Sequence, residues 1–324
     1  MTFLVKLRQA LMGVSYKEAI SFSEGNSETW KQLETAVLSA IEGYHATLES
    51  SKFEVLIPRL DALALELRGY AYEGAAMGLT ALDCVLPWKK RLQTYLAGPG
   101  TPHIYMIHIG AGEALARLRR KPEPFIARLE DRTLCWLVMD GYGFHEGFFA
   151  RKRYVDDKVV PAHLSPYARR IFDQGLGRSL WFSAGANVER IAATVAAFPM
   201  NRQADLWVGV GVACAYVGGV DHPTVEAFQQ AAGPYQSYMA AGTAFVAKGR
   251  QRAGNLVPHT HLACQVLWGL SSELVAQIVD TGFQDLPTGG PEPAYEILQQ
   301  RLLAQFAKRR EAVPQPVFQP KEAK

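Results

Sequence analysis

Residues 140–146, Asp-Gly-Tyr-Gly-Phe-His-Glu, are the segment of this chain that is richest in side chains able to move protons. Asp140, Tyr142, His145 and Glu146 supply carboxylic acids, a phenol and an imidazole, which are common general acids and bases. The two glycines permit either a capped turn into a helix or the close approach of a ligand to the backbone. Four titratable groups exceed what a turn requires. Asp140 and His145 are therefore candidate catalytic residues, and Tyr142 is a candidate binding residue.

Glu73 lies between Tyr72 and Gly74 in a segment rich in alanine, methionine and leucine. Burying a carboxylate costs several kcal/mol unless it is paired or protonated. One interpretation is a salt bridge with Arg68 or with an arginine from the second half of the chain. The other is a carboxylic acid with a raised pKa that donates or accepts a proton. Glu73 is the third candidate catalytic residue, and Tyr72 is a candidate binding residue.

Two segments of the second half combine opposite charges with tryptophan, residues 173–181 (DQGLGRSLW) and 202–207 (RQADLW). We expect each segment to form a buried aspartate–arginine bridge that joins the two halves of the molecule. The alternative is a site for an anion or carboxylate, which the planar guanidinium group suits. The candidate binding residues here are Arg178, Trp181, Asp205 and Trp207.

Three histidines stand close after prolines, and they are also candidate binding residues. His259 and His261 would share a face on a strand, whereas on a helix they would diverge by about 200°. With Asp140 and His145 they approach a metal-ligand set, but the spacing fixes no third ligand. We therefore predict no metal and no cofactor. His103 is either a proton shuttle or a loop residue.

The signatures of several large enzyme classes are absent from the sequence. There is no P-loop, no nucleophile elbow and no paired-histidine zinc motif, since Phe149 stands where the second histidine would be. The Gly-rich segment at Gly110 lacks the third glycine of a dinucleotide fingerprint. The aspartate-rich motif of metal-dependent terpene cyclases is also missing. The four cysteines stand far apart in apolar runs, which is typical of buried thiols.

Charge and hydropathy exclude some partners. The net charge of the 324 residues is +3, which gives no electrostatic case for nucleic acid. The longest uncharged apolar run, between Asp205 and Asp221, is shorter than the ~20 residues of a spanning helix, and its glycines favour a closely packed buried helix. Charges at Lys6, Arg8 and Lys17 make the N-terminal segment unlike a signal peptide. We expect a cytoplasmic protein without a membrane span.

The elements that must position these residues are predicted to be helices, because apolar residues recur at spacings of three and four. The clearest are Glu28–Thr47, Phe53–Leu67, Val188–Phe198, Val225–Ala232, Leu262–Ile278 and Ala294–Phe306. Asn187 and Thr224 are expected N-caps, and Gly98 and Gly233 are expected helix stops. The fold class is mainly α. A strand interpretation competes in two short apolar runs, His103–Ile109 and Leu134–Met139.

Self-similarity predicts an internal duplication. The matched positions are Tyr72 with Trp207 and Gly74 with Gly209, Gly110 with Gly242, and Cys135 with Cys264, at offsets of 135, 132 and 129 residues. Two helical halves would then pack with pseudo-two-fold symmetry around one core. The expected organisation is an N-terminal extension (1–34), a first half (35–150), a connector (151–171), a second half (172–282), a C-terminal helix (283–308) and a disordered tail (309–324).

Several segments spread over nearly the whole chain resemble one family. They are Arg68–Met77, Gly98–Leu118, Asp140–Phe149, Asp173–Phe182, Arg202–Gly219 and Gly254–Ala263. These segments resemble UnbL-type proteins, which are encoded beside the iterative polyketide synthases of enediyne biosynthesis. The family is chiefly known as a domain of unknown function. The resemblance implies a role in secondary-metabolite biosynthesis, with other proteins of that pathway as partners, and it supplies no catalytic residue.

These observations lead us to expect an enzyme that acts on a hydrophobic, unsaturated small molecule by acid–base chemistry. A cyclase or isomerase fits best, with Asp140, His145 or Glu73 as acid or base. Aromatic residues would line the pocket and stabilise developing positive charge, namely Tyr72, Tyr142, Trp181 and Trp207. One alternative is a non-canonical terpene cyclase on a polyprenyl substrate. Another is a non-catalytic binding or scaffold protein, and a homodimer also stays open.

Overall fold

A computed structural model describes residues 12–287 and 289–312, and within these ranges the chain is helical and contains no strand. The prediction of a mainly α fold is confirmed. The strand alternative is wrong at both places, because residues 103–109 lie in η2 and α7 and residues 134–139 lie in η3 and α9. Both runs resemble strands in the sequence because these helices are buried on nearly every side. Their apolar residues therefore do not recur at the helical spacing of three and four positions.

The helices begin and end as follows. The first half contains α2 (Tyr16–Ala19), α3 (Glu28–Glu49), α4 (Phe53–Asp61), α5 (Arg68–Val85), η1 (Pro87–Lys89), α6 (Arg91–Ala97), η2 (Thr101–His103), α7 (Ile104–Arg117), α8 (Glu123–Ile126), η3 (Leu134–Trp136) and α9 (Leu137–Phe149). There follow η4 (Lys152–Asp156), α10 (Pro166–Ser183), α11 (Val188–Ala196), α12 (Met200–Tyr216), α13 (His222–Ala231), η5 (Gly233–Tyr235), α14 (Gln236–Arg252), α15 (Pro258–Trp268), α16 (Ser272–Phe283) and α17 (Ala294–Ala312).

Side chains at the helix ends explain several boundaries. Asn187 caps α11, as predicted, by accepting a hydrogen bond from the Arg190 amide at 2.8 Å. Thr224 is not a cap, because Asp221 caps α13 and accepts from the Thr224 amide. The single helix predicted over 262–278 is two helices, since Gly269 adopts a left-handed φ of 62° and ends α15.

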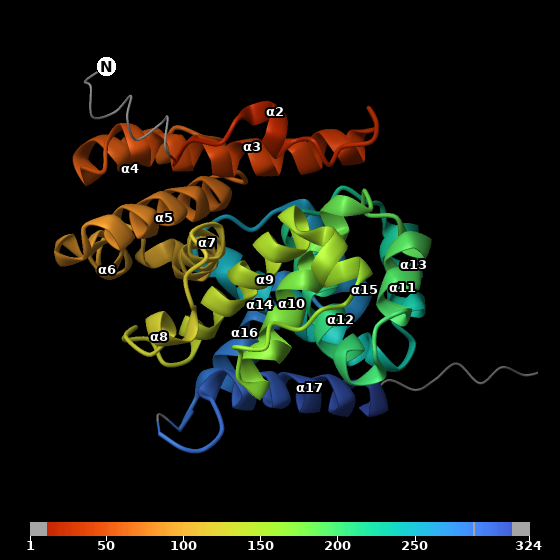
Figure 1. Ribbon diagram of the computed structural model, residues 1–324. Helices are drawn as coiled ribbons and strands as arrows, with labels where there is room; N and C mark the ends of the chain where they lie inside the picture. The colour runs from red at the N-terminus through yellow and green to blue at the C-terminus, as the bar shows by residue number, and fades with distance from the viewer. Residues whose placement is uncertain (1–11, 288, 313–324) are drawn as a thin grey trace, which may run out of the picture.

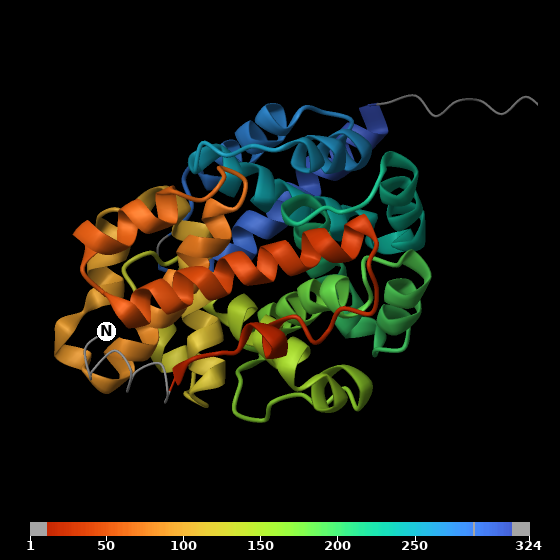
Figure 2. The same cartoon turned by 90° about the horizontal axis from the view of Figure 1, so that it is seen from above.

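Consecutive long helices pack side by side, from α3 through α5, α7, α9, α10 and α12 to α14. In Figure 1, α3 covers one side of this group and α17 the opposite side. Figure 2, seen from above, shows α3 lying across the molecule. One main hydrophobic core contains residues from Leu33 to Phe306, so both halves share it. The run after Asp205 forms the buried helix α12, as expected.

Glycines allow these helices to approach so closely that backbone touches backbone. A Cβ atom on Gly110 of α7 would lie 2.0 Å from the Glu73 carbonyl oxygen of α5. A Cβ on Gly141 of α9 would lie 1.9 Å from the Ile109 oxygen, and one on Gly175 of α10 would lie 2.1 Å from the Asp140 oxygen. Any larger residue at these positions would push neighbouring helices apart.

Two of the predicted boundaries between segments fall inside helices. Helix α3 spans the boundary placed at residue 35, and α10 spans the one placed at residue 172. Helix α17 continues through Ala312, so the first residues of the predicted tail are helical, whereas residues 313–324 lie outside the described residues.

Of the described helices, none alone is long and apolar enough to cross a membrane; α15 and α16 together would be, but they meet at a 70° bend.

Candidate functional site

A cavity of about 110 Å³ lies in the core between the long helices. Most of its wall is apolar, with Ile109, Phe144, Phe148 and Phe182 among the lining side chains. Charged residues also face it, and they are Glu73, Glu113, Arg117, Asp140, Arg178 and Arg250. Charged side chains in an apolar enclosure are costly to bury, so their arrangement identifies this cavity as the candidate site.

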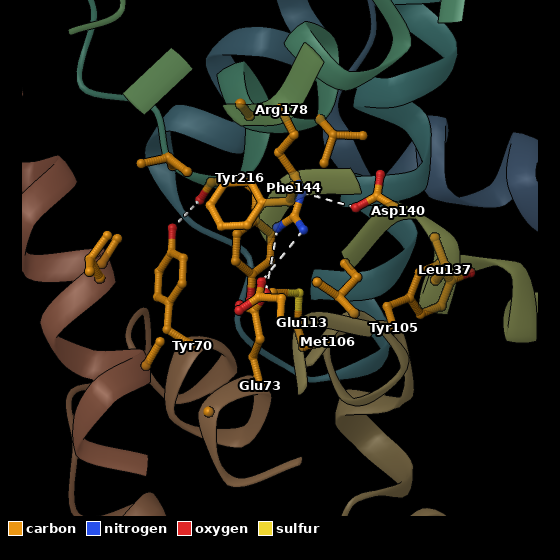
Figure 3. A pocket seen from close by; sticks show the side chains of 18 of the residues that line it. Tyr70, Glu73, Tyr105, Met106, Glu113, Leu137, Asp140, Phe144, Arg178 and Tyr216 are labelled. Carbon is orange, nitrogen blue, oxygen red and sulfur yellow. Dashed lines mark hydrogen bonds and ion pairs between the residues drawn. The ribbon is translucent and has the colours of Figure 1, made fainter. Parts of the chain in front are cut away.

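Arg178 of α10 extends into the space between three carboxyl groups that come from three different helices (Figure 3). Its Nε lies 3.0 Å from Asp140 Oδ1 of α9, and its Nη1 lies 3.5 Å from Glu73 Oε1 of α5. Its Nη2 lies 3.8 Å from Glu113 Oε1 of α7. The guanidinium carbon stands 4.1 Å above the centre of the Phe144 ring, as a cation–π contact.

Glycine spacing explains why these four side chains meet. Glu113 stands three residues after Gly110, and Arg178 stands three residues after Gly175, so each charged side chain shares a helical face with its glycine. The same glycines bring α5 against α7 and α9 against α10. The glycines of residues 140–146 likewise sit inside α9 as helix contacts, so the capped-turn alternative for this segment is wrong.

Burial raises the pKa of all three carboxyl groups. Arg178 opposes this at all three groups, because its positive charge favours each carboxylate. The pKa of Glu113 rises well above its usual range, first through burial and then through the negative charge of Glu73. A hydrogen bond joins Glu113 to Glu73; it raises the pKa of Glu113 and opposes the rise in the pKa of Glu73, so Glu113 is the donor of the pair.

Further hydrogen bonds fix Asp140. Gln174 Nε2 donates to Asp140 Oδ2 at 2.9 Å and lies 3.2 Å from the Tyr295 hydroxyl. Among the described residues, Nε and Nη2 of Arg178 have no hydrogen-bond partner, because they meet Asp140 at 3.0 Å and Glu113 at 3.8 Å as ion pairs. The Arg178 guanidinium group thus has unused N–H donors beside the Glu113 carboxyl group.

His145 lies apart from this cluster, although sequence analysis grouped it with Asp140. Its side chain lines a second, more open cleft of about 550 Å³ with Glu146, Arg117 and Arg119. Burial lowers the pKa of His145 to about 4, so the imidazole is neutral at neutral pH. Residues 140 and 145 point to different sides because they are five positions apart on α9.

The other predicted aromatic residues and His103 make contacts with neighbouring parts of the fold. Tyr72 donates a hydrogen bond to Asp61 at 3.0 Å, and its ring lies 4.0 Å from that of His103, which lines the cavity. Trp181 donates to the Gly218 carbonyl at 3.0 Å. The ring of Tyr142 contacts Phe172, and Trp207 is part of the main hydrophobic core.

The expected aspartate–arginine bridges exist with different partners. Arg202 pairs with Asp173, and Arg170 pairs with Asp205 at 3.1 Å. Both bridges join α10 to α12 and neither reaches the first half, so the expectation that they join the two halves is wrong. Arg178 of α10 does reach the first half, where it meets Glu73 of α5.

His259 and His261 diverge on α15, as their helical spacing requires. His259 Nε2 lies 2.9 Å from the Tyr216 carbonyl oxygen, and His261 Nδ1 lies 2.6 Å from Ser272 Oγ. Across the described ranges, no group of three or more His, Cys, Asp or Glu side chains is placed to hold a metal ion. In the cavity, the Arg178 guanidinium occupies the space between the carboxyl groups.

Sequence analysis missed Glu113 and Arg250. Glu113 stands in a Gly-Ala-Gly-Glu segment that was considered only as a dinucleotide motif. The signal that could have revealed it is its likeness to Gly-Leu-Gly-Arg at residues 175–178, where a charged residue also follows two helix-contact glycines. Arg250 carries no such signal, because nothing in its Gly-Arg-Gln-Arg context distinguishes a buried arginine from exposed ones.

Comparison with known proteins gives one match. No curated protein and no solved structure matches the chain. Residues 3–306 match the family described as "Protein of unknown function (DUF1702)". This match spans every residue that lines the cavity, and it agrees with the expectation of a domain of unknown function. The chain therefore belongs to the DUF1702 family.

Proposed function

We propose that this protein is an acid–base enzyme, an isomerase or cyclase, that acts on a hydrophobic unsaturated small molecule in the cavity. The observation that carries the proposal is the hydrogen-bonded pair of Glu113 and Glu73, both with a raised pKa, on the wall of a mainly apolar cavity. Such a pair contains a proton donor and a proton acceptor in contact, which is what proton-driven rearrangement of a carbon skeleton requires.

The reaction proceeds by addition and removal of one proton. Glu113 transfers its proton to one carbon of a double bond, whose π electrons form the new C–H bond and leave positive charge on the second carbon. The Phe144 ring faces the cavity and stabilises that charge. The Glu73 carboxylate then removes a proton from a neighbouring carbon, and those electrons form the new double bond. Transfer of this proton from Glu73 to Glu113 restores the starting state.

The resemblance to UnbL-type proteins supports a polyketide-derived polyene as the substrate, in a cytoplasmic secondary-metabolite pathway. In a cyclase, a second double bond of the same molecule attacks the cationic carbon before the proton is removed. A polyprenyl chain would undergo the same steps, which is the terpene-cyclase alternative. A carrier or scaffold of the pathway would bind the same molecule without moving a proton, so proton exchange separates it from an enzyme.

The test is deuterium incorporation from D₂O into conjugated polyenes, measured by mass spectrometry with the purified protein. We expect carbon-bound deuterium with the wild type and a loss of about 10²- to 10⁴-fold in Glu113→Gln. Glu226→Gln, which changes an exposed glutamate of α13, is the control and should behave as the wild type. A substrate that binds but takes up no deuterium would overturn the enzymatic proposal and favour a carrier.

A further inference from the structure

Arg250 of α14 is a second buried arginine of the cavity, and only 1% of it is exposed. Its Nη2 donates to the Tyr216 carbonyl at 2.7 Å, and its Nη1 donates to the Asn255 carbonyl at 3.2 Å. The guanidinium carbon stands 4.1 Å above the centre of the Tyr216 ring. In the part of the chain that the structure describes, Nε of Arg250 has no hydrogen-bond partner.

The charge of Arg250 also lacks a counter-ion. No carboxylate oxygen of the described residues lies within 4.0 Å of its guanidinium group, whereas Arg178 and Arg202, the other buried arginines, both have carboxylate partners. Tyr216 ends α12, so its carbonyl adds the partial negative charge of a helix C-terminus, roughly half an elementary charge. Much of the positive charge of the Arg250 guanidinium group therefore stays uncompensated in an apolar environment.

Arg250 and the Glu73–Glu113 pair are parts of one cavity. Tyr70 and Tyr216 also line this cavity, joined by a hydrogen bond of 3.0 Å from the Tyr70 hydroxyl to the Tyr216 carbonyl (Figure 3). The charges of both Arg250 and Glu73 act on each of these two tyrosines. The cavity thus has two charged regions, a cationic one at Arg250 and an acid–base one at the Glu113–Glu73 pair, with aromatic side chains beside both.

We infer that the Arg250 end binds the carboxylate of the substrate, so the substrate is an unsaturated carboxylic acid whose apolar chain extends toward Glu113. This inference rests on the proposed function for the direction of the chain. A carboxylate carries the single negative charge that Arg250 lacks, and the unused Nε–H is a donor for it. A diphosphate would bring more negative charge than this single guanidinium group can neutralise, so a carboxylic acid is the class that fits.

The test compares sorbic acid, a six-carbon dienoic acid, with its methyl ester by isothermal titration calorimetry. We expect the acid to bind about tenfold or more tightly than the ester, because a hydrogen bond to a charged group is lost in the ester. We also expect the affinity of the acid to stay constant as pH rises above the pKa of the free acid. An acid bound in its neutral form would instead lose about tenfold in affinity per pH unit.

Variants separate Arg250 from the rest of the cavity. Arg250→Met should abolish the preference for acid over ester, and Arg250→Lys should retain part of it. Arg252→Met, which removes an exposed charge two residues further along α14, should bind as the wild type. If the Arg250→Met protein does not fold, the wild type alone tests the inference, through the relative affinities of acid and ester and the pH dependence of the affinity of the acid.

Equal binding of acid and ester, binding of neither, or affinity that falls with pH overturns the inference. A carboxylate preference that is lost in Arg250→Met, while no polyene takes up deuterium, would support the Arg250 site and contradict the proposed acid–base reaction.

Discussion

Three carboxyl groups facing one arginine distinguish this site from an ordinary buried ion pair. The Asp173–Arg202 pair balances one charge with one charge. In the cavity, Glu73, Glu113 and Asp140 would together exceed the charge of Arg178, and desolvation makes each excess negative charge expensive. A bound proton relieves part of this cost, and we propose that Glu113 holds it, because its pKa is raised well above the usual range.

This proton makes stability depend on pH. The folded protein binds the Glu113 proton more tightly than the unfolded chain does, so the free energy of unfolding falls as pH rises above the ordinary value of 4.5. Glu113→Gln cannot titrate, and we expect it to gain stability relative to the wild type from about pH 4.5 upward. Urea unfolding of both proteins between about pH 4.5 and 8 measures the difference.

The matched control for this prediction is Glu226→Gln, which should stay parallel to the wild type across the same pH range. A constant difference between the wild type and Glu113→Gln would show that the folded and unfolded chains bind the proton equally. That outcome would remove Glu113 as a neutral acid at neutral pH.

Sequence reasoning recovered part of the site. Glu73 stood out because a carboxylate in an apolar segment needs a partner, and Asp140 stood out as part of a dense group of titratable residues. One anticipated partner of Glu73, an arginine from the second half, is Arg178. The pairing of Arg178 with three carboxyl groups could not be predicted, since it depends on which faces of α5, α7, α9 and α10 meet. His145 was misplaced for the same reason, because nearness in sequence on a helix is not nearness in space.

At the scale of elements, glycine contacts decide how the helices pack. Gly141→Ala would place a methyl group 1.9 Å from the Ile109 carbonyl oxygen, and backbone cannot swing aside as a side chain can. We expect a loss of about 3 kcal/mol in the free energy of unfolding. Chemical denaturation measures it.

Gly249→Ala in α14 is the control for this prediction. There the new methyl group would lie 3.3 Å from the Tyr105 side chain, and alanine favours helix by about 1 kcal/mol over glycine, so we expect little change. Equal effects of the two substitutions would contradict the claim that backbone contact at Gly141 fixes the distance between α7 and α9.

The same contacts bear on the predicted duplication. A Cβ on Gly110 would meet the Glu73 oxygen at 2.0 Å, and one on its proposed equivalent, Gly242, would meet the Val208 oxygen at 2.1 Å. Residues 73 and 208 are themselves separated by the offset of 135 found in the sequence. The recurrence supports the duplication, which stays a prediction. Helix bounds were predicted less well, because Gly269 breaks a segment whose apolar period continues through it.

At the scale of the whole molecule, one core spans both halves, and Arg178 of the second half neutralises carboxyl groups of the first. We therefore expect the chain to unfold in one cooperative step. Tryptophan fluorescence and far-UV circular dichroism should give coincident urea transitions. Two separated transitions would show that the halves are independent domains and that the cavity between their helices is not a stable unit.

Infrared spectroscopy tests most directly whether Glu113 is a neutral carboxylic acid at neutral pH, and it needs no knowledge of the substrate. We predict that the wild type at neutral pH shows the carbonyl band of a buried protonated carboxylic acid, that this band shifts in D₂O, and that it is missing from Glu113→Gln. A wild-type spectrum without that band, or an unchanged band in Glu113→Gln, would contradict a protonated Glu113.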